Sequence, residues 1–229
     1  MSGILYAIPT PLGGAAADAL PASALRTVRS LRHFIVENAK SARAFLKDAG
    51  VDPKSVRVEE LGEHSDIPSL LQPLQNGDAV GLLSEAGCPA IADPGANLVE
   101  AAHAAGIRVA PLVGPSSIVL ALMASGLEGQ RFAFCGYLPR EAGARARRIR
   151  ELEARSRRER ETQIFIETPY RNDALLAALL ESLPDRALLC LATDLTLPSE
   201  AIQTRSVAAW RKARPAIGKR PTVFLLLSG

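Results

Sequence analysis

AVGLLSEAGCPAIADPGANLVEAAHAAG, residues 79–106, places an apolar run, a loop of small residues and a helix-like run in direct succession. A short apolar run followed by a helical pattern is typical of a βα unit in a parallel sheet. The loop between them, 84–95, holds two prolines, two glycines and two acids among small residues. Small residues let the backbone approach a ligand closely, although ordinary turns use the same residues.

The same alternation extends through the first half of the chain. Strand-like runs are 3–8, 33–37, 55–60, 79–85 and 107–113, and helix-like runs are 19–31, 40–50, 67–77 and 96–106. This alternation predicts an N-terminal α/β domain over residues 1–112 with a mostly parallel sheet.

A Gly-Pro turn in VGPSS (113–117) is expected to begin a second α/β domain, residues 113–229. Its order of elements is less regular, which predicts a mixed sheet. Expected strands are 132–138, 162–168, 187–195, 201–207 and 222–228, and expected helices are 116–126, 140–160 and 171–183.

Composition excludes several classes of protein. The 229 residues include three cysteines and three histidines, all widely separated, which favours neither a disulfide framework nor a metal site. No apolar run approaches the roughly 20 residues that a membrane-spanning helix needs. The start, MSGILYAIPTPLGG, lacks the basic region of a signal peptide. We therefore expect a cytoplasmic protein without a metal and without membrane attachment.

Positive charge is concentrated in one segment. Residues 140–160 hold nine arginines against four glutamates, whereas the whole chain carries a net charge of only +3. One interpretation is a helix that binds phosphates. The other is a solvated helix with Glu–Arg pairs at i,i+4 spacing.

Three Gly/Pro-rich loops fall at the predicted carboxyl ends of strands, at 8–14, 84–95 and 112–117. Ligands of open α/β sheets collect at that edge, so the three loops together favour a site for a nucleoside-bearing cofactor. There is no G-x-x-x-x-G-K-[ST] phosphate loop, no G-x-G-x-x-G after the first strand and no G-x-S-x-G elbow.

Five motifs in order carry a family resemblance. They are LYAIPTPLG (5–13), SEAGCPAIADPG (84–95), PLVGPSS (111–117), FCGYLP (134–139) and IFIETPYR (164–171). Together they resemble the tetrapyrrole methylase superfamily, and within it most closely the ribosomal RNA small-subunit methyltransferase I branch.

The resemblance implies two α/β domains with S-adenosylmethionine (SAM) bound in a cleft between them, in a homodimer. It implies methylation of small-subunit ribosomal RNA at the ribose 2′-hydroxyl of a cytidine. Two alternatives stay open: methylation of a tetrapyrrole or other small molecule, and a SAM-binding module without catalysis.

By motif position, the resemblance implies a set of cofactor-binding residues. They are Pro11, Ala86, Gly87, Cys88, Ile91, Ala92, Asp93, Ser116, Ser117, Thr168, Pro169 and Ala192.

The substrate-side loops depart from the branch's usual pattern. TPLGGAAADAL lacks an N-L-x-D-like element, and ENAKSAR (37–43) keeps only the Glu of E-D-T-R. Expected substrate-binding residues are Glu37, Glu63, His64 and Arg171.

Methyl transfer to a hydroxyl needs a group that takes the proton, and Glu85 and Asp93 are the expected catalytic residues. For three of these candidates, a local structural role is the alternative to a role in catalysis or substrate binding. Glu37 would cap its helix, Asp93 would be a helix N-cap followed by proline at the first turn, and His64 would be a solvated loop residue.

Overall fold

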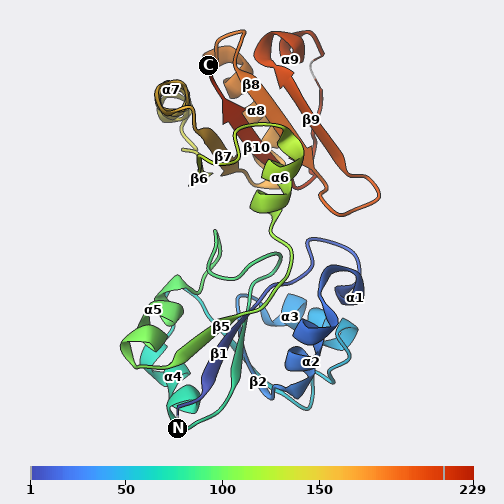
Figure 1. Cartoon of the computed structure of the whole chain (residues 1–229), viewed down its shortest axis with the longest axis vertical. Helices are drawn as coiled ribbons and strands as arrows, with labels where there is room; N and C mark the ends of the chain where they lie inside the picture. The colour runs from blue at the N-terminus through green and yellow to red at the C-terminus, as the bar shows by residue number, and fades with distance from the viewer. Residues whose placement is uncertain (1, 214) are drawn as a thin grey trace. The chain divides into compact units, whose positions relative to one another are not determined.

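The computed structural model describes residues 2–213 and 215–229. The chain divides into two compact units, Met1–Ser116 and Ser117–Gly229 (Figure 1). The division lies inside the VGPSS turn, between Ser116 and Ser117. Both units are α/β, as predicted.

Unit 1 contains a five-stranded parallel sheet. Its strands are β1 (Ile4–Ile8), β2 (His33–Val36), β3 (Arg57–Glu60), β4 (Val80–Leu83) and β5 (Arg108–Pro111). They lie in the order β3-β2-β4-β1-β5, and every neighbouring pair is parallel. The predicted parallel sheet is thereby confirmed.

The helices of unit 1 are α1 (Ala16–Ala19), α2 (Ala22–Ser30), α3 (Ala39–Asp48), α4 (Ile67–Gln75) and α5 (Ala96–Ala104). The helix predicted over 19–31 is observed as α2, which begins only at Ala22, whereas α1 was not predicted. Pro21 stands before α2 in an extended conformation, with φ −64° and ψ 151°. Proline has no N–H for the helical ladder, so α1 cannot continue through it.

Two apolar clusters cover the two faces of this sheet. Ile8, Phe34 and Leu83 face α1, α2 and α3, whereas Leu5, Ile35 and Leu82 face α4 and α5. Adjacent strand residues point to opposite faces, so Phe34 and Ile35 enter different clusters. Helices therefore lie on both faces, as a parallel sheet requires (Figure 1).

Unit 2 contains a five-stranded mixed sheet. Its strands are β6 (Phe132–Tyr137), β7 (Thr162–Ile166), β8 (Leu188–Thr193), β9 (Ala201–Ser206) and β10 (Thr222–Leu227). The order is β6-β7-β10-β8-β9, with only the β6–β7 pair parallel. This confirms the mixed sheet predicted for the second half of the chain.

Its helices are α6 (Ser117–Ser125), α7 (Ala142–Glu159), α8 (Asn172–Ser182) and α9 (Val207–Ala213), with a 3₁₀ turn η1 (Pro169–Arg171). The sequence patterns did not predict α9. Its Trp210 is buried in the core and donates its indole N–H to the Leu189 carbonyl at 2.8 Å. In the same core Phe165 stacks on Phe224, with ring centroids 5.9 Å apart.

The cysteines are free thiols. Cys190 is buried, Cys88 and Cys135 are half-buried, and burial raises the pKa of all three. Over residues 2–213 and 215–229, no helix is both long and apolar enough to cross a membrane. Within the same ranges, His, Cys, Asp and Glu side chains form no group of three that could hold a metal ion.

Candidate functional site

The topology of unit 1 marks one place on its sheet for a ligand. β1 and β4 are neighbours, but the chain leaves β1 toward α1 and α2 on one face and leaves β4 toward α5 on the other. Loops that diverge to opposite faces open a crevice at the carboxyl ends of the two strands, where ligands of α/β sheets bind. The loops 8–14 and 84–95 begin at that switch point.

Hydrogen bonds join the three predicted loops at this edge. Thr10 and Gly87 form an isolated antiparallel bridge, with N···O distances of 2.8 and 3.0 Å. The Thr10 hydroxyl also donates to the Ser84 carbonyl at 3.3 Å, and the Cys88 thiol donates to the Pro115 carbonyl at 3.4 Å. The segments 8–14, 84–95 and 112–117, far apart in sequence, therefore form one structure.

The 84–95 loop has an unusual backbone. Gly87 and Gly95 have φ of 80° and 131°, and Ala90 and Ala92 have φ of 65° and 68°. Left-handed φ costs a non-glycine residue roughly 1–2 kcal/mol, and such strain concentrates at functional sites. Between the two alanines, the Ile91 side chain is 49% exposed. The loop thus holds small residues and one exposed apolar side chain in a strained conformation.

Some backbone polar groups of this loop have no hydrogen-bond partner. Within the part of the chain that the structure describes, Ala86 and Ala92 make no backbone hydrogen bond in this loop, and residues 89–90 form a turn. Backbone N–H and C=O groups need partners, so accessible ones are available to a polar ligand.

Asp93 follows this strained segment and has a perturbed ionisation. Burial is the main cause that raises its pKa from 3.8 to about 6. The negative charges of Glu37 and Glu85 raise this pKa further, and a hydrogen bond from Ser84 opposes them. A carboxyl group with a pKa near 6 suits proton transfer near neutral pH.

Hydrogen bonds also connect the other two acids. The Glu85 backbone N–H donates to the Glu37 carboxylate at 3.0 Å, and the Ser41 hydroxyl donates to the Glu85 carboxylate at 3.2 Å. The structure therefore brings Glu37 and Glu85 together, in the electrostatic range of Asp93.

The two helix-capping alternatives are wrong. Asn38 caps α3, because its side-chain oxygen accepts from the N–H groups of Lys40 and Ser41 at 2.9 and 3.2 Å. The residue before α5 is Gly95, without a side-chain cap, so Asp93 does not cap that helix. Glu37 and Asp93 thus have no capping role that would account for them.

Asp93 should make the stability of unit 1 depend on pH. A raised pKa means that the folded state favours the protonated form, so this stabilising contribution is present below about pH 4 and is lost as pH rises through about 6. Allowing for its partial exposure, we expect a loss of roughly 1–2 kcal/mol. The measurement is urea unfolding of wild type and Asp93→Asn between pH 5 and pH 8. The difference between the two proteins should shift in favour of the variant as pH rises; a constant difference would contradict the raised pKa.

The remaining substrate-side candidates of unit 1 are exposed. Glu63 and His64 lie in the loop after β3, at the same carboxyl edge of the sheet as the three joined loops. His64 is solvent-exposed, in agreement with its alternative as a solvated loop residue.

The predicted residues of unit 2 have different surroundings. Ser117 begins α6, and Thr168 and Pro169 are half-buried before α8. Ala192 is fully buried in β8, between β10 and β9, so its side chain offers no surface to a ligand. Arg171 forms an ion pair with the buried Glu167, which gives its guanidinium a local partner.

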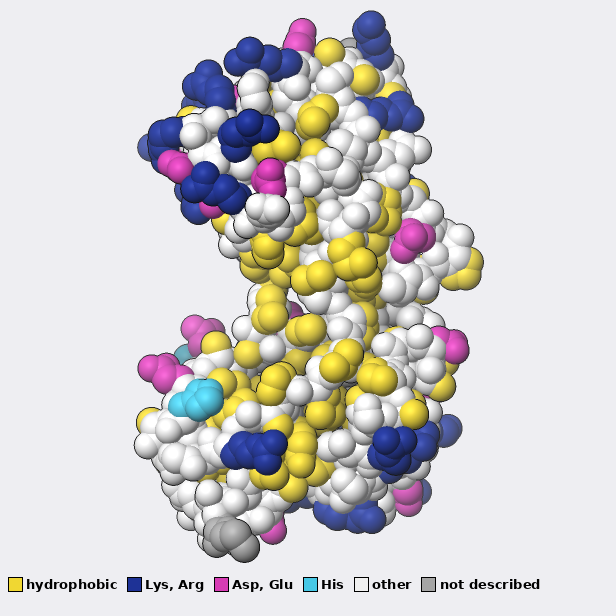
Figure 2. Space-filling model, in the orientation of Figure 1, with side chains coloured by type: hydrophobic (Ala, Val, Ile, Leu, Met, Phe, Trp, Pro, Cys, Tyr) yellow, Lys and Arg dark blue, Asp and Glu magenta, His cyan; other side chains and the backbone are white. Residues whose placement is uncertain are grey.

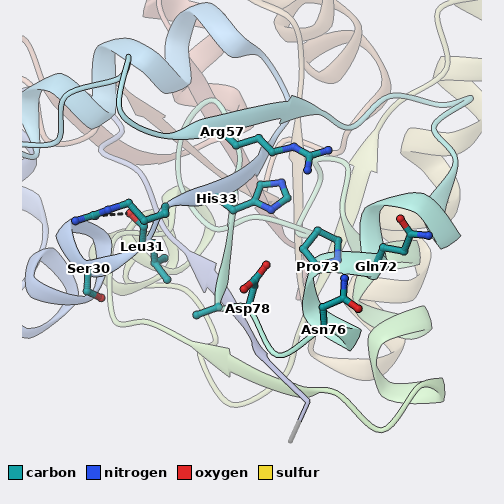
Figure 3. A pocket seen from close by; sticks show the side chains of 10 residues that line it. Ser30, Leu31, His33, Arg57, Gln72, Pro73, Asn76 and Asp78 are labelled. Atoms are coloured by element: carbon teal, nitrogen blue, oxygen red, sulfur yellow. Dashed lines mark hydrogen bonds between the residues drawn. The ribbon is translucent and has the colours of Figure 1, made fainter.

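A cavity of about 500 Å³ lies at the opposite, amino edge of the unit 1 sheet. Figure 3 shows His33 beside Arg57, with Asp78 below them. The Glu59 carboxylate accepts from His33 at 2.6 Å and from Arg57 at 2.7 Å, which ties β2 to β3. None of the predicted site residues lines this cavity, so we place the candidate site at the joined loops instead.

Comparisons with known proteins establish the family of the chain. The profile of the tetrapyrrole (corrin/porphyrin) methylases matches residues 5–209. The chain belongs to the tetrapyrrole methylase family. This makes it a methyltransferase, and the family implies SAM as the methyl donor.

The chain is similar to several individual proteins. A ribosomal RNA small subunit methyltransferase I from Vibrio cholerae is 34% identical over 90% of this chain and 69% of its own length. One from Mesorhizobium japonicum is 35% identical over 90% of this chain and 68% of its own length. The uroporphyrin-III-C-methyltransferase structure from Thermus thermophilus has a TM-score of 0.60 at 20% identity, over 100% of this chain and 93% of that one. This last likeness concerns the fold alone.

The residues of the joined loops fit SAM, as expected for a tetrapyrrole methylase. SAM carries an amino-acid end and ribose hydroxyls, which need hydrogen-bond donors and acceptors in a space free of large side chains. The 84–95 loop offers the backbone groups of Ala86 and Ala92 together with the Asp93 carboxyl group. A Cβ atom added at Gly87 would lie 3.3 Å from Leu12, so the glycine allows the close packing of two loops of the site.

Sequence reasoning missed three residues of this candidate site. Thr10 and Ser84 are buried at the ends of β1 and β4, and their hydroxyls hold the loops together. Ser41 in α3 reaches Glu85. For Thr10 and Ser84 the available signal was position, because polar residues at the end of a buried strand lie at the carboxyl edge of the sheet.

Proposed function

We propose that this chain transfers a methyl group from SAM to the ribose 2′-hydroxyl of a cytidine in small-subunit ribosomal RNA, as a homodimer. The observation that carries the proposal is the identity of 33–35% with proteins named ribosomal RNA small subunit methyltransferase I, over 80–96% of this chain. Residues 5–209 match the wider family, which supports the methyltransferase activity itself.

The three joined loops would bind and orient the donor. SAM supplies an electrophilic methyl group on a positively charged sulfur. In the proposal, backbone groups of 86–92 bind its polar ends, and the Thr10–Gly87 bridge fixes the loop that presents them. Holding the reacting groups in line can lower the barrier to such a transfer by roughly 7–11 kcal/mol when alignment is good.

Asp93 would accept the proton. As the hydroxyl oxygen bonds to the methyl carbon, the carbon–sulfur electron pair stays with sulfur and the hydroxyl proton moves to a carboxylate. With a pKa of about 6, Asp93 is largely ionised near pH 7.5 yet basic enough to take a proton. Glu85 is the second candidate, and its carboxylate already accepts a hydrogen bond from Ser41.

Glu37, Glu63 and His64 would face the acceptor. All three follow strands whose carboxyl ends lie at the edge that carries the joined loops. This is also where the sequence departs from the pattern that the ribosomal RNA branch usually shows, so these loops would tune recognition of the acceptor.

Transfer of radiolabelled methyl from SAM tests the proposal. Small ribosomal subunits, free ribosomal RNA and small molecules from a strain lacking the chain are each incubated with the purified protein. We expect label in small-subunit RNA that is recovered as 2′-O-methylcytidine after digestion to nucleosides. Label confined to small molecules would overturn the RNA substrate in favour of a tetrapyrrole or similar acceptor. SAM binding without transfer to any fraction would favour the non-catalytic alternative.

A further inference from the structure

One surface of unit 2 plays no part in the site described above. Helix α7 buries Ile149, Leu152 and Ser156, and on its opposite face Arg147, Arg150 and Arg157 are exposed. We name these three residues the arginine stripe. Figure 2 shows the corresponding concentration of Lys and Arg side chains over α7.

Most of the nearby acids have other partners, although the negative charge of Glu141 acts on Arg147. Glu151 pairs with Arg148, Glu159 with Arg158 and Arg131, and Glu161 with Arg155. The Glu153 carboxylate accepts from the Ser228 hydroxyl at 2.7 Å. In the described ranges, no ion pair within 4.0 Å reaches the arginine stripe, and none of the pairs on α7 has i,i+4 spacing. The alternative of a solvated helix with Glu–Arg pairs is therefore met in part, because such pairs exist but at spacings other than i,i+4.

Helix stability does not account for the stripe either. Cations in the last turn of a helix interact favourably with its dipole, which covers Arg157. The effect falls off within that turn, so it does not cover Arg147 and Arg150 near the middle of α7. These two are also i,i+3 neighbours of like charge, an arrangement that costs a helix up to about 0.5 kcal/mol. An external anion would remove that cost.

The net charge of unit 2 and the side chains exposed on α7 indicate which kind of anion the arginine stripe would bind. Residues 117–229 carry 18 Lys and Arg against 12 Asp and Glu, a net charge of +6, whereas residues 1–116 carry 9 against 12, a net charge of −3. No large exposed apolar side chain lies on α7, although helices that bind membrane surfaces need one to insert. We propose that the arginine stripe binds the phosphate backbone of RNA and so docks the RNA substrate on unit 2.

The dimensions of the stripe suit this partner. At 1.5 Å of rise per residue, Arg147 and Arg157 lie about 15 Å apart along the helix axis. One strand of a nucleic-acid helix, with a phosphate about every 3.4 Å of axis, presents about four phosphates over that length. Guanidinium groups bind phosphates in bidentate fashion, and a helix that is fixed by a buried face holds them in a constant spacing. Backbone contacts position RNA without reading its sequence.

This inference rests on the proposed function, and the test separates the two. The test protein carries Arg147→Gln, Arg150→Gln and Arg157→Gln, since glutamine keeps helix propensity. The control carries Lys54→Gln, Arg186→Gln and Lys212→Gln, which removes three exposed cations elsewhere with the same change in net charge. Fluorescence anisotropy gives the affinity of each protein for labelled small-subunit RNA and for a labelled RNA of unrelated sequence, over a range of salt concentrations.

Loss of three phosphate contacts to a single strand should weaken binding roughly 50-fold at about 0.15 M salt and reduce the salt slope by about 2. Both RNAs should be affected equally, while the control and the SAM affinity of every variant stay at the wild-type level. If wild type methylates ribosomal RNA and the stripe variant binds RNA as tightly as wild type, the role of the stripe is overturned and the proposed function stands. Absence of methylation by wild type would overturn the proposed function, and a loss of RNA affinity in the stripe variant would still support the stripe. Binding to phosphatidylserine vesicles is measured as well. If the stripe variant loses vesicle binding but keeps its RNA affinity, the stripe binds a membrane and the proposal is overturned.

Discussion

Asparagine in place of Asp93 is expected to slow methyl transfer about 100- to 10,000-fold near pH 8, the usual effect of removing a proton acceptor. Asparagine keeps the size of the side chain and an oxygen that can accept from Ser84, but it cannot take a proton at neutral pH. The measurement is single-turnover transfer from radiolabelled SAM to small-subunit RNA. Because Asp93 is also a predicted cofactor contact, the SAM dissociation constant of the variant is measured separately.

The pH profile distinguishes catalysis from a structural defect. If Asp93 accepts the proton, the wild-type rate rises with pH and levels off above an apparent pKa of about 6, because only the carboxylate is active. The Asp93→Asn variant should be slow, and its rate should no longer rise with pH around 6. Glu85→Gln is the matched comparison, because its carboxylate is exposed and is held by Ser41. If Glu85→Gln is slow and Asp93→Asn is fast, Glu85 and not Asp93 accepts the proton.

The fold was predictable as far as local patterns determine it. The alternation of apolar runs and helical patterns predicted each strand of the parallel sheet, because short buried strands separated by amphipathic helices have few other arrangements. The order β3-β2-β4-β1-β5 was out of reach, since it depends on pairings between distant segments such as Leu5 with Val80. The break at Pro21 was readable, but the apolar spacing across it dominated the prediction.

In the candidate site too, local patterns were predictable from the sequence and tertiary contacts were not. Glycines and prolines after apolar runs located the loops, because their backbone chemistry is local. The roles of individual side chains depend on tertiary contacts. Glu37 and Asn38 are neighbours, yet Asn38 caps α3 and Glu37 reaches the N–H of Glu85. Nothing in the sequence separates those two roles.

Gly87→Ala is expected to weaken SAM binding about tenfold or more. Gly87 has φ of 80° and exchanges two backbone hydrogen bonds with Thr10. Alanine in that conformation costs roughly 1–2 kcal/mol, and its Cβ would lie 3.3 Å from Leu12. The variant relieves both problems by leaving the left-handed region, which breaks the bridge to Thr10 and releases the loop that presents 86–92. A penalty of about 1.4 kcal/mol on the binding conformation corresponds to a tenfold change in affinity.

Gly106→Ala supplies the control for backbone strain. Gly106 follows α5 with φ of 67°, is exposed, and has open space where a Cβ would stand. Both variants should lose unfolding free energy, about 1 kcal/mol for Gly106→Ala and more for Gly87→Ala, because the latter also breaks the bridge to Thr10. Calorimetric titration with SAM should then separate them, with Gly106→Ala at the wild-type affinity. Equal SAM affinities for the two variants would mean that the Thr10–Gly87 bridge does not shape the cofactor site, and the loops around Pro11 and Cys88 would have to bind SAM without it.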